Sequence, residues 1–269
     1  MANQKSVTQT LMEKSQTSLY PDEGELFKSH STEDKSSAYL VFFVHFLGGH
    51  KKVLKRHVEL VNELGFDAYV FNVNDSWKDY SYVPVSKKSK KFGLKHAMAD
   101  QIENHLNLFP NYKNKIVFAF SNISASAIEA IARRIETKNA KDIKAMICDS
   151  GPGMDFMSAS YNLIKHQLKI RSFFSRLVRT PILAYGWSPH LNKDISADLE
   201  KFPKNFPILS IRGWRDLLIT PQSIDQVFEP HKNLKWKKLN LPEGGHINGL
   251  RDFPSEYRPG LEAFLQDFY

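Results

Sequence analysis

One stretch of the sequence decides the fold: Lys115-Ile116-Val117-Phe118-Ala119-Phe120-Ser121. Its apolar residues do not alternate with polar ones, which is typical of a strand buried on both faces of a parallel sheet. The following residues, Ser124 to Ile135, carry isoleucines at helical spacing and predict a helix. A serine therefore stands at the turn between a buried strand and a helix.

Expected strands and expected helices alternate along the rest of the chain. This alternation is typical of an α/β fold with a doubly wound, mostly parallel sheet. Gly65 and Pro110 mark the ends of two of the expected helices. The predicted strands are 38–44, 66–73, 115–120, 143–148 and one that begins at Phe206, and the predicted helices are 51–64, 93–108, 124–135 and 255–268.

Two further polar residues follow strands in the second half of the chain. Asp216 comes after Gly213-Trp214-Arg215 at the end of one apolar strand, and His246 follows two glycines in a later loop. Residues just past the carboxyl ends of parallel strands converge on one edge of the sheet. Serine, acid and histidine in this chain order are the triad of the α/β-hydrolase fold. We therefore expect Ser121 as nucleophile, His246 as base and Asp216 as the acid that orients the base.

The nucleophile and the acid each have a rival. The usual Gly-x-Ser-x-Gly elbow is missing, because Ile123 stands where a glycine is common. Ser124 has smaller neighbours and is an alternative nucleophile, although a serine there also suits the N-cap of the following helix. Asp225 is a weaker alternative to Asp216, because it is expected inside a helix.

Backbone N–H groups near the expected nucleophile are candidates for an oxyanion hole. One belongs to Asn122, directly after Ser121, and the other to Phe46 or Leu47, in the glycine-bearing turn after the first strand. We interpret His45, at the start of that turn, as a structural residue rather than a base.

Length and composition fit one core domain with an insertion. The chain has 269 residues, of which 42% are hydrophobic, enough for one sizeable core. We assign 37–153 and 205–269 to an α/β-hydrolase core, 154–204 to a helical cap and 1–36 to a polar N-terminal extension. The cap carries aromatic and aliphatic residues that either line an acyl pocket or pack the cap on the core: Phe173, Phe174, Leu177, Ile182, Leu183, Tyr185 and Trp187.

The net charge of +8 is compatible with an anionic partner such as a membrane surface. The dense patch Lys87-Lys88-Ser89-Lys90-Lys91 has no interleaved aromatic residues, so it favours a solvated loop over a nucleic-acid platform. We expect no specific nucleic-acid partner, and the sequence leaves the oligomeric state open. No run of apolar residues is long enough to cross a bilayer.

Several absences also bear on function. The single cysteine, Cys148, excludes internal disulfides and fits a small core residue. The start of the sequence lacks the apolar segment of a secretory signal, so we expect a cytoplasmic protein. The histidines are scattered, and we expect neither a metal site nor an organic cofactor.

Four segments together resemble the transmembrane protein 53-like family of α/β-hydrolase relatives. The likeness covers most of 38–153 and 206–269 and departs at Ile123 and Ser124, where the family has two glycines. The resemblance implies the α/β-hydrolase fold and favours Ser121, Asp216 and His246 as the site. The segments are Phe120-Ser121-Asn122, Asp149-Ser150-Gly151-Pro152-Gly153, Leu54 to Phe71, and His246 with Phe253-Pro254-Ser255-Glu256-Tyr257 and Phe264-Leu265.

The sequence thus supports two functions of different classes. The first is a serine hydrolase that cleaves an ester or thioester of a small-molecule or acyl substrate through an acyl-enzyme. The alternative is a non-catalytic protein of the same fold, with a degenerate elbow at Ile123, that binds a lipid, peptide or partner.

Overall fold

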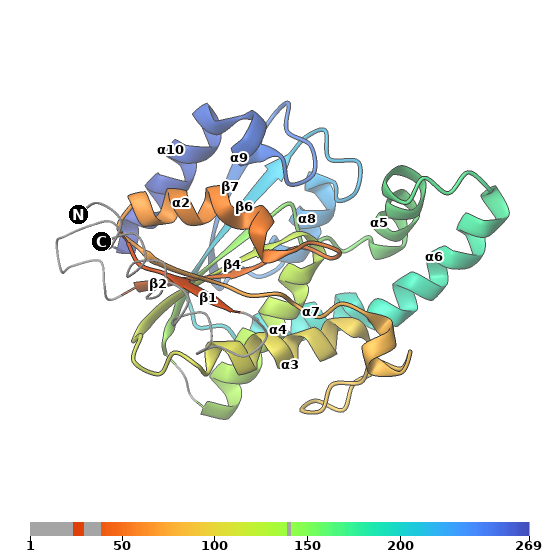
Figure 1. Ribbon diagram of the computed structural model, residues 1–269, viewed down its shortest axis with the longest axis horizontal. Helices are drawn as coiled ribbons and strands as arrows, with labels where there is room; N and C mark the ends of the chain where they lie inside the picture. The colour runs from red at the N-terminus through yellow and green to blue at the C-terminus, as the bar shows by residue number, and fades with distance from the viewer. Residues whose placement is uncertain (1–23, 30–38, 139–140, 269) are drawn as a thin grey trace, which may run out of the picture.

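A mostly parallel sheet of seven strands forms the centre of the molecule (Figure 1), in the order β1-β3-β2-β4-β5-β6-β7. The computed structural model describes residues 24–29, 39–138 and 141–268. Strands β2 to β7 pair in parallel, and only the short β1 is antiparallel to its neighbour β3. The strands are β1 (Glu25–Phe27), β2 (Tyr39–Val44), β3 (Asp67–Val70), β4 (Asn114–Phe120), β5 (Ile143–Asp149), β6 (Phe206–Gly213) and β7 (Leu234–Leu241).

Helices cover both faces of this sheet. Helices α3, α4, α7 and α8 pack on one face, and α2 and α10 pack on the other. The main helices are α2 (Lys55–Glu63), α3 (Leu94–Leu106), α4 (Ser124–Lys138), α5 (Phe156–Asn162), α6 (Phe173–Trp187), α7 (Leu191–Glu200), α8 (Pro221–Phe228), α9 (Gly249–Asp252) and α10 (Pro254–Leu265). The predicted α/β class and doubly wound sheet are confirmed.

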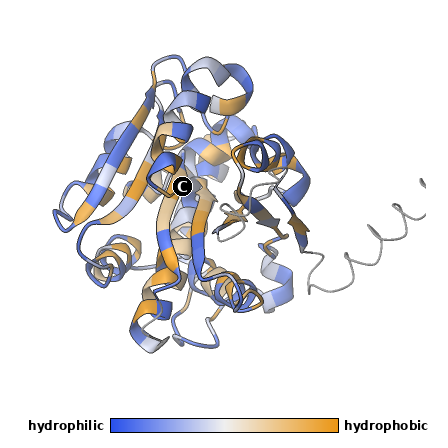
Figure 2. Ribbon diagram, turned by 90° about the vertical axis from the view of Figure 1, so that its left-hand side faces the viewer, coloured by the Kyte–Doolittle hydropathy of each residue, from blue (hydrophilic) through white to orange (hydrophobic). Residues whose placement is uncertain are grey.

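The central strands are buried on both faces, as their unbroken apolar runs predict. In β2, Leu40 and Phe42 belong to the core on one face, and Val41 and Phe43 belong to the core on the other. Figure 2 shows the strands at the centre coloured mainly as apolar, with polar and apolar residues mixed in the surrounding helices. The topology reverses direction between β2 and β4, which leaves a crevice beyond their carboxyl ends.

Helices α5, α6 and α7 lie between β5 and β6, within the predicted cap 154–204. Helix α7 packs against α4 in the helical layer, where Ile195 and Leu199 join the main core. Helices α5 and α6 contact each other and stand away from the sheet (Figure 1). We call the segment 156–187 the outer insertion.

The insertion and the N-terminal segment show details that the sequence did not predict. Within the predicted helical cap, α5 and the π-helical turn η5 (Leu163–Gln167) end before α6 begins at Phe173. The hydroxyl of Ser172 caps the new helix by accepting the N–H of Ser175 at 3.3 Å. The edge strand β1 falls within the predicted extension 1–36, whose other residues, apart from 24 and 28–29, lie outside the described part of the chain. β1 has three residues, which are too few for an alternating strand pattern to be recognised in the sequence.

Candidate active site

Ser121 lies at the turn where β4 ends and α4 begins. Residues Ser121–Ile123 form a single 3₁₀ turn, η4, and α4 starts directly after it. The backbone φ of Ser121 is 56°, in the left-handed region that residues other than glycine rarely adopt. A strained turn of this kind is how a nucleophile elbow presents its hydroxyl at the sheet edge. Gly151, after β5, gives the turn room, because a Cβ there would collide with the backbone of Ser121.

The three residues expected to form a triad lie within hydrogen-bond distance of one another. The Ser121 Oγ and the His246 Nε2 are 3.0 Å apart, and the His246 Nδ1 is 2.7 Å from the Asp216 Oδ2. A carboxylate accepts only, so Nδ1 carries the ring proton and Nε2 is left to accept the proton of the serine hydroxyl. The line from hydroxyl to imidazole to carboxylate has the geometry that general-base activation of a serine requires.

Backbone contacts hold the acid and the base in place. The Asp216 Oδ1 accepts the N–H groups of Leu218 at 2.7 Å and Ile219 at 2.9 Å, so its other oxygen is free to face the histidine. Gly213, at the end of β6, contacts the His246 loop so closely that a Cβ would collide with Gly244. The two glycine-bearing loops therefore bring together side chains that are 30 residues apart in sequence.

The rival residues lie elsewhere. Ser124 is fully buried at the start of α4 beside Cys148, and it does not line the cavity next to Ser121. Asp225 pairs with Arg212 and with Lys238, at 3.2 Å from the latter, rather than with the histidine. Of the candidate serines and acids, the structure therefore places Ser121 and Asp216 next to His246.

Ile123 occupies the glycine position of the usual elbow without entering the site. Its side chain is fully buried in the core that α4 shares with the sheet. The bulky residue therefore points into the protein interior, while the hydroxyl of Ser121 reaches His246.

The turn after β2 faces the same cavity. Phe46, Leu47 and Asn122 line it together with Ser121, so the residues whose backbone groups are expected to bind an oxyanion border the site. His45 is buried, with its Nε2 accepting the N–H of Val73 at 2.8 Å and its Nδ1 2.8 Å from the carbonyl oxygen of Phe46. Burial lowers the pKa of His45. The imidazole of His45 is therefore neutral, and its two ring nitrogens hold the turn in place.

A second carboxylate, Asp149, lies buried behind the histidine. It accepts the hydroxyl protons of Tyr257 and Ser150, each at 2.8 Å, and Ser150 in turn accepts the N–H of Ile247 at 3.0 Å. Burial raises the pKa of Asp149 to about 6, against the effect of these two hydrogen bonds. Asp149 thus supports the His246 loop from β5. The sequence signal for Asp149 is an aspartate at the end of an apolar strand, but the sequence alone assigns it no role.

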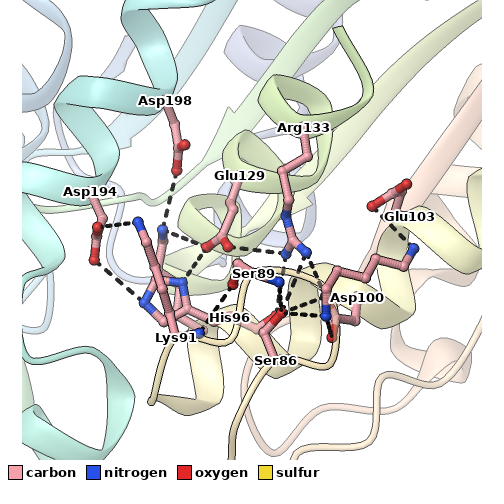
Figure 3. Close-up of polar contacts among 12 residues, drawn as sticks. Ser86, Ser89, Lys91, His96, Asp100, Glu103, Glu129, Arg133, Asp194 and Asp198 are labelled. Carbon is pink, nitrogen blue, oxygen red and sulfur yellow. Dashed lines mark hydrogen bonds and ion pairs between the residues drawn. The ribbon is translucent and has the colours of Figure 1, made fainter. Parts of the chain in front are cut away.

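Buried ion pairs fix α4, which begins immediately after the elbow (Figure 3). Glu129 on α4 accepts hydrogen bonds from Lys95 at 2.8 Å and from His96 at 2.6 Å, both on α3. Lys95 also faces Asp198 of α7 at 3.4 Å. Burial acts to raise the pKa of Glu129, but the His96 hydrogen bond and the neighbouring cations lower it to about 2. We call Lys95, His96, Glu129, Arg133, Asp194 and Asp198 the buried ion cluster.

A cavity of about 540 Å³ opens beside Ser121 and His246. Its other walls come from the outer insertion, through Phe156, Leu163 and Leu183, and from the segment before α2. A partly apolar cavity of this size suits a small-molecule or acyl substrate. Within the described ranges, no three His, Cys, Asp or Glu side chains are grouped to hold a metal ion, and no helix is long and apolar enough to span a bilayer.

The chain is similar in structure to several hydrolases. It aligns with an esterase from Pyrococcus furiosus at a TM-score of 0.62 and 16% identity, over 87% of this chain and 83% of that one. A hydrolase from Oleispira antarctica aligns at a TM-score of 0.57 and 15% identity, over 91% of this chain and 95% of that one. A monoacylglycerol lipase from Paleococcus ferrophilus aligns at 0.55 and 16%, over 91% and 98%.

These likenesses, together with the parallel sheet, show that the chain has the α/β-hydrolase fold. No protein-family model matches the sequence, and no curated protein matches it.

Proposed function

We propose that this protein is a serine hydrolase that cleaves an ester or thioester through an acyl-enzyme. The observation that carries the proposal is the continuous hydrogen-bonded line from Ser121 through His246 to Asp216, at 3.0 Å and 2.7 Å, beside a cavity. The esterase and lipase names among structures of the same fold support the reaction class.

The proposed reaction uses each group in turn. The Ser121 Oγ attacks the carbonyl carbon while the His246 Nε2 takes the hydroxyl proton, and Asp216 stabilises the resulting imidazolium. Backbone N–H groups of Asn122 and of Phe46 or Leu47 receive the oxyanion. The tetrahedral adduct expels an alcohol or thiol, which takes the proton from His246. Water then attacks the acyl-enzyme by the same route and releases the acid.

Covalent labelling with a fluorophosphonate tests the nucleophile directly. We expect the wild-type protein to be labelled, Ser121→Ala to lose the label and Ser124→Ala to keep it. A folded protein that is never labelled and turns over no activated ester would overturn the proposal and favour the binding-protein alternative. Loss of label only in Ser124→Ala would identify Ser124 as the nucleophile instead of Ser121.

The role of Asp216 has a separate test. Asp216→Asn keeps the size of the side chain but cannot stabilise the imidazolium, so we expect kcat for an activated ester to fall about 10⁴-fold. Asp225→Asn is the matched control, because Asp225 pairs with Arg212 away from the site. Equal losses in both variants would remove Asp216 from the mechanism.

We also propose that the chain belongs to the transmembrane protein 53-like family and acts in the cytoplasm. The resemblance at 149–153 is supported by position, because Gly151 contacts Ser121 and Ser150 bonds the residue after His246. A solved family member without these two contacts would contradict the assignment. Fractionation of cells with the tagged protein tests the location.

A further inference from the structure

The charged side chains around the cavity are of one sign. Lys52, Lys55 and Arg56 line the wall before and at the start of α2, and Arg251 of α9 lines it beside them. Lys52, Lys55 and Arg56 are three and four positions apart and therefore share one helical face. No aspartate or glutamate lines the cavity among the residues that the structure describes.

The four cations differ in whether a carboxylate lies within ion-pair distance in the described part of the chain. Lys55 pairs with Glu59 at 3.7 Å, and Arg251 pairs with Asp252 at 2.7 Å. Lys52 and Arg56 form no ion pair within the described part of the chain. Arg56 lies within electrostatic range of Asp252, but that carboxylate is already bound by Arg251, so Lys52 and Arg56 remain available to a ligand. Across the cavity, Phe156, Leu163 and Leu183 of the outer insertion supply an apolar wall.

We propose that the site takes anionic amphiphiles: esters with an apolar acyl chain and a phosphate or carboxylate close to the scissile bond. The acyl chain lies against the outer insertion, and the anionic group meets Lys52 and Arg56. Arginine and lysine bind such groups through charge-assisted hydrogen bonds, which are the stronger class of hydrogen bond. This substrate class rests on the proposed hydrolase function.

Paired substrates separate the substrate class from the reaction. We would compare kcat/KM for a monoacylglycerol and for the 1-acylglycerol 3-phosphate with the same acyl chain, below their micelle concentrations. We expect the phosphate ester to be preferred about tenfold or more. An O-acyl ester of a short hydroxy acid, compared with a neutral ester of the same acyl chain, reports on the carboxylate.

Charge-removing variants localise the preference. Lys52→Gln with Arg56→Gln should bring the ratio of the two kcat/KM values close to one. The control is Lys204→Gln with Lys232→Gln, which removes the same charge. These lysines precede β6 and β7, at the amino-terminal edge of the sheet and away from the site, so the ratio should stay unchanged. Preference for the neutral ester in wild type, or an equal ratio change in the control, overturns the substrate class. Failure to cleave either ester, with no label on Ser121, refutes the hydrolase function instead.

A different observation carries a second proposal, on the outer face of α6. Apolar side chains four positions apart are exposed to solvent there: Phe174 is 77% exposed, Ile182 62% and Val178 61%. Thr180, Ala184 and Trp187, on the other side of the helix, are buried. A row of exposed apolar residues along one helix is a docking surface rather than the scattered exposure of an ordinary surface.

The charges around this face indicate the kind of partner that it binds. Between Asp155 and Asp194 the sequence contains no acidic residue. The basic residues of this span are Lys165, Lys169, Arg171, Arg176, Arg179 and Lys193. Arg176 and Arg179 lie on α6 itself, and Lys165, Lys169 and Arg171 lie just before it. An apolar and basic segment without acidic residues is suited to the interface of an anionic membrane. A second copy of the chain would instead bring like charges together across a symmetric contact.

We infer that the outer face of α6 docks on an anionic lipid surface. Sedimentation of the full chain with phosphatidylcholine vesicles, with and without phosphatidylserine, tests this independently of any hydrolysis. We expect binding that requires phosphatidylserine and weakens with salt. Replacing Phe174, Val178 and Ile182 together by serine should reduce the partition coefficient about tenfold or more.

The basic residues have a matched control. Lys169→Gln, Arg171→Gln and Arg179→Gln should each weaken binding about fivefold at low salt. Lys141→Gln, Lys204→Gln and Lys232→Gln, before β5, β6 and β7, should not. No binding to phosphatidylserine vesicles, or equal losses in both sets, overturns the inference. A dimer in solution that the three serine substitutions dissociate, without vesicle binding, assigns the face to a second copy and also overturns it.

Discussion

Two regions of this protein reverse the usual placement of side chains. In the buried ion cluster between α3, α4 and α7, Lys95 is fully buried and Glu129 nearly so. On α6, large apolar side chains such as Phe174 are mostly exposed. The first region contains buried charges, and the second contains exposed apolar side chains.

The two regions differ in whether the unfavourable placement of their side chains is compensated within the protein. Lys95 and Glu129 contact each other at 2.8 Å, and each has a further oppositely charged neighbour. Their desolvation is offset within the fold, which ties α4 to its neighbours and leaves nothing for a ligand to add. The side chains on the outer face of α6 have no such compensation among the residues that the structure describes, and contact with a partner would remove them from water. Buried charges that are paired within the fold therefore indicate a structural role. Exposed apolar side chains without such a partner indicate a binding surface.

The largest effect that we expect comes from removing the lysine of the cluster. Lys95→Met leaves Glu129 and Asp198 buried without their central cation, so the free energy of unfolding should fall by about 3–5 kcal/mol. Urea denaturation measures the change. The control is Arg258→Ala, which removes the exposed pair with Glu63 and should cost less than about 1 kcal/mol. Similar losses in the two variants would show that burial does not distinguish the pairs.

The cluster should also give a characteristic dependence on acid. The pKa of Glu129 is lowered from 4.5 to about 2, so its contribution is complete above pH 4.5 and is lost as the pH falls towards 2. The stability difference between wild type and Glu129→Gln should therefore shrink by about 3 kcal/mol between about pH 5 and pH 2. Denaturation curves across this range measure the difference, and a constant difference would contradict the low pKa.

Asp149 should respond to pH in the opposite direction. Its pKa is raised from 3.8 to about 6, so the stability that its protonated form provides is lost as the pH rises from about 4 to about 6. Asp149→Asn keeps an acceptor for Tyr257 without this charge. At pH 8 we expect the variant to be more stable than wild type by up to about 3 kcal/mol, with little difference below pH 4. A variant less stable at pH 8 would show that the ionised carboxylate is needed.

The sequence predicts well the parts of the molecule that follow from local pattern and parallel-sheet geometry. Unbroken apolar runs predict the central strands, because β4 and its neighbours are buried on both faces. Ser121, Asp216 and His246 follow three of these strands, and the structure brings their side chains together at one edge. Their catalytic roles stay predictions until the labelling experiment.

Other features depend on contacts that no single segment contains. Lys95 lies on a helix that periodicity predicts, but its burial depends on Glu129 and Asp198 from two other helices. The support that Asp149 gives to the His246 loop needs Tyr257, 108 residues away. The exposed face of α6 was not predicted. Its apolar residues were expected to line a pocket or to pack the cap on the core, but Phe174 is 77% and Ile182 62% exposed.

The smallest effect on stability should come from that exposed face. Phe174, Val178 and Ile182 keep most of their solvent-accessible area on folding, so serine at any one of them should change the free energy of unfolding by about 0.5 kcal/mol or less. Ala184→Ser, on the buried side of the same helix, is the control and should cost more, because it places a hydroxyl in a packed interface. A larger loss at Phe174 than at Ala184 would mean that the outer face packs against the protein itself, which would remove the contrast between the two regions.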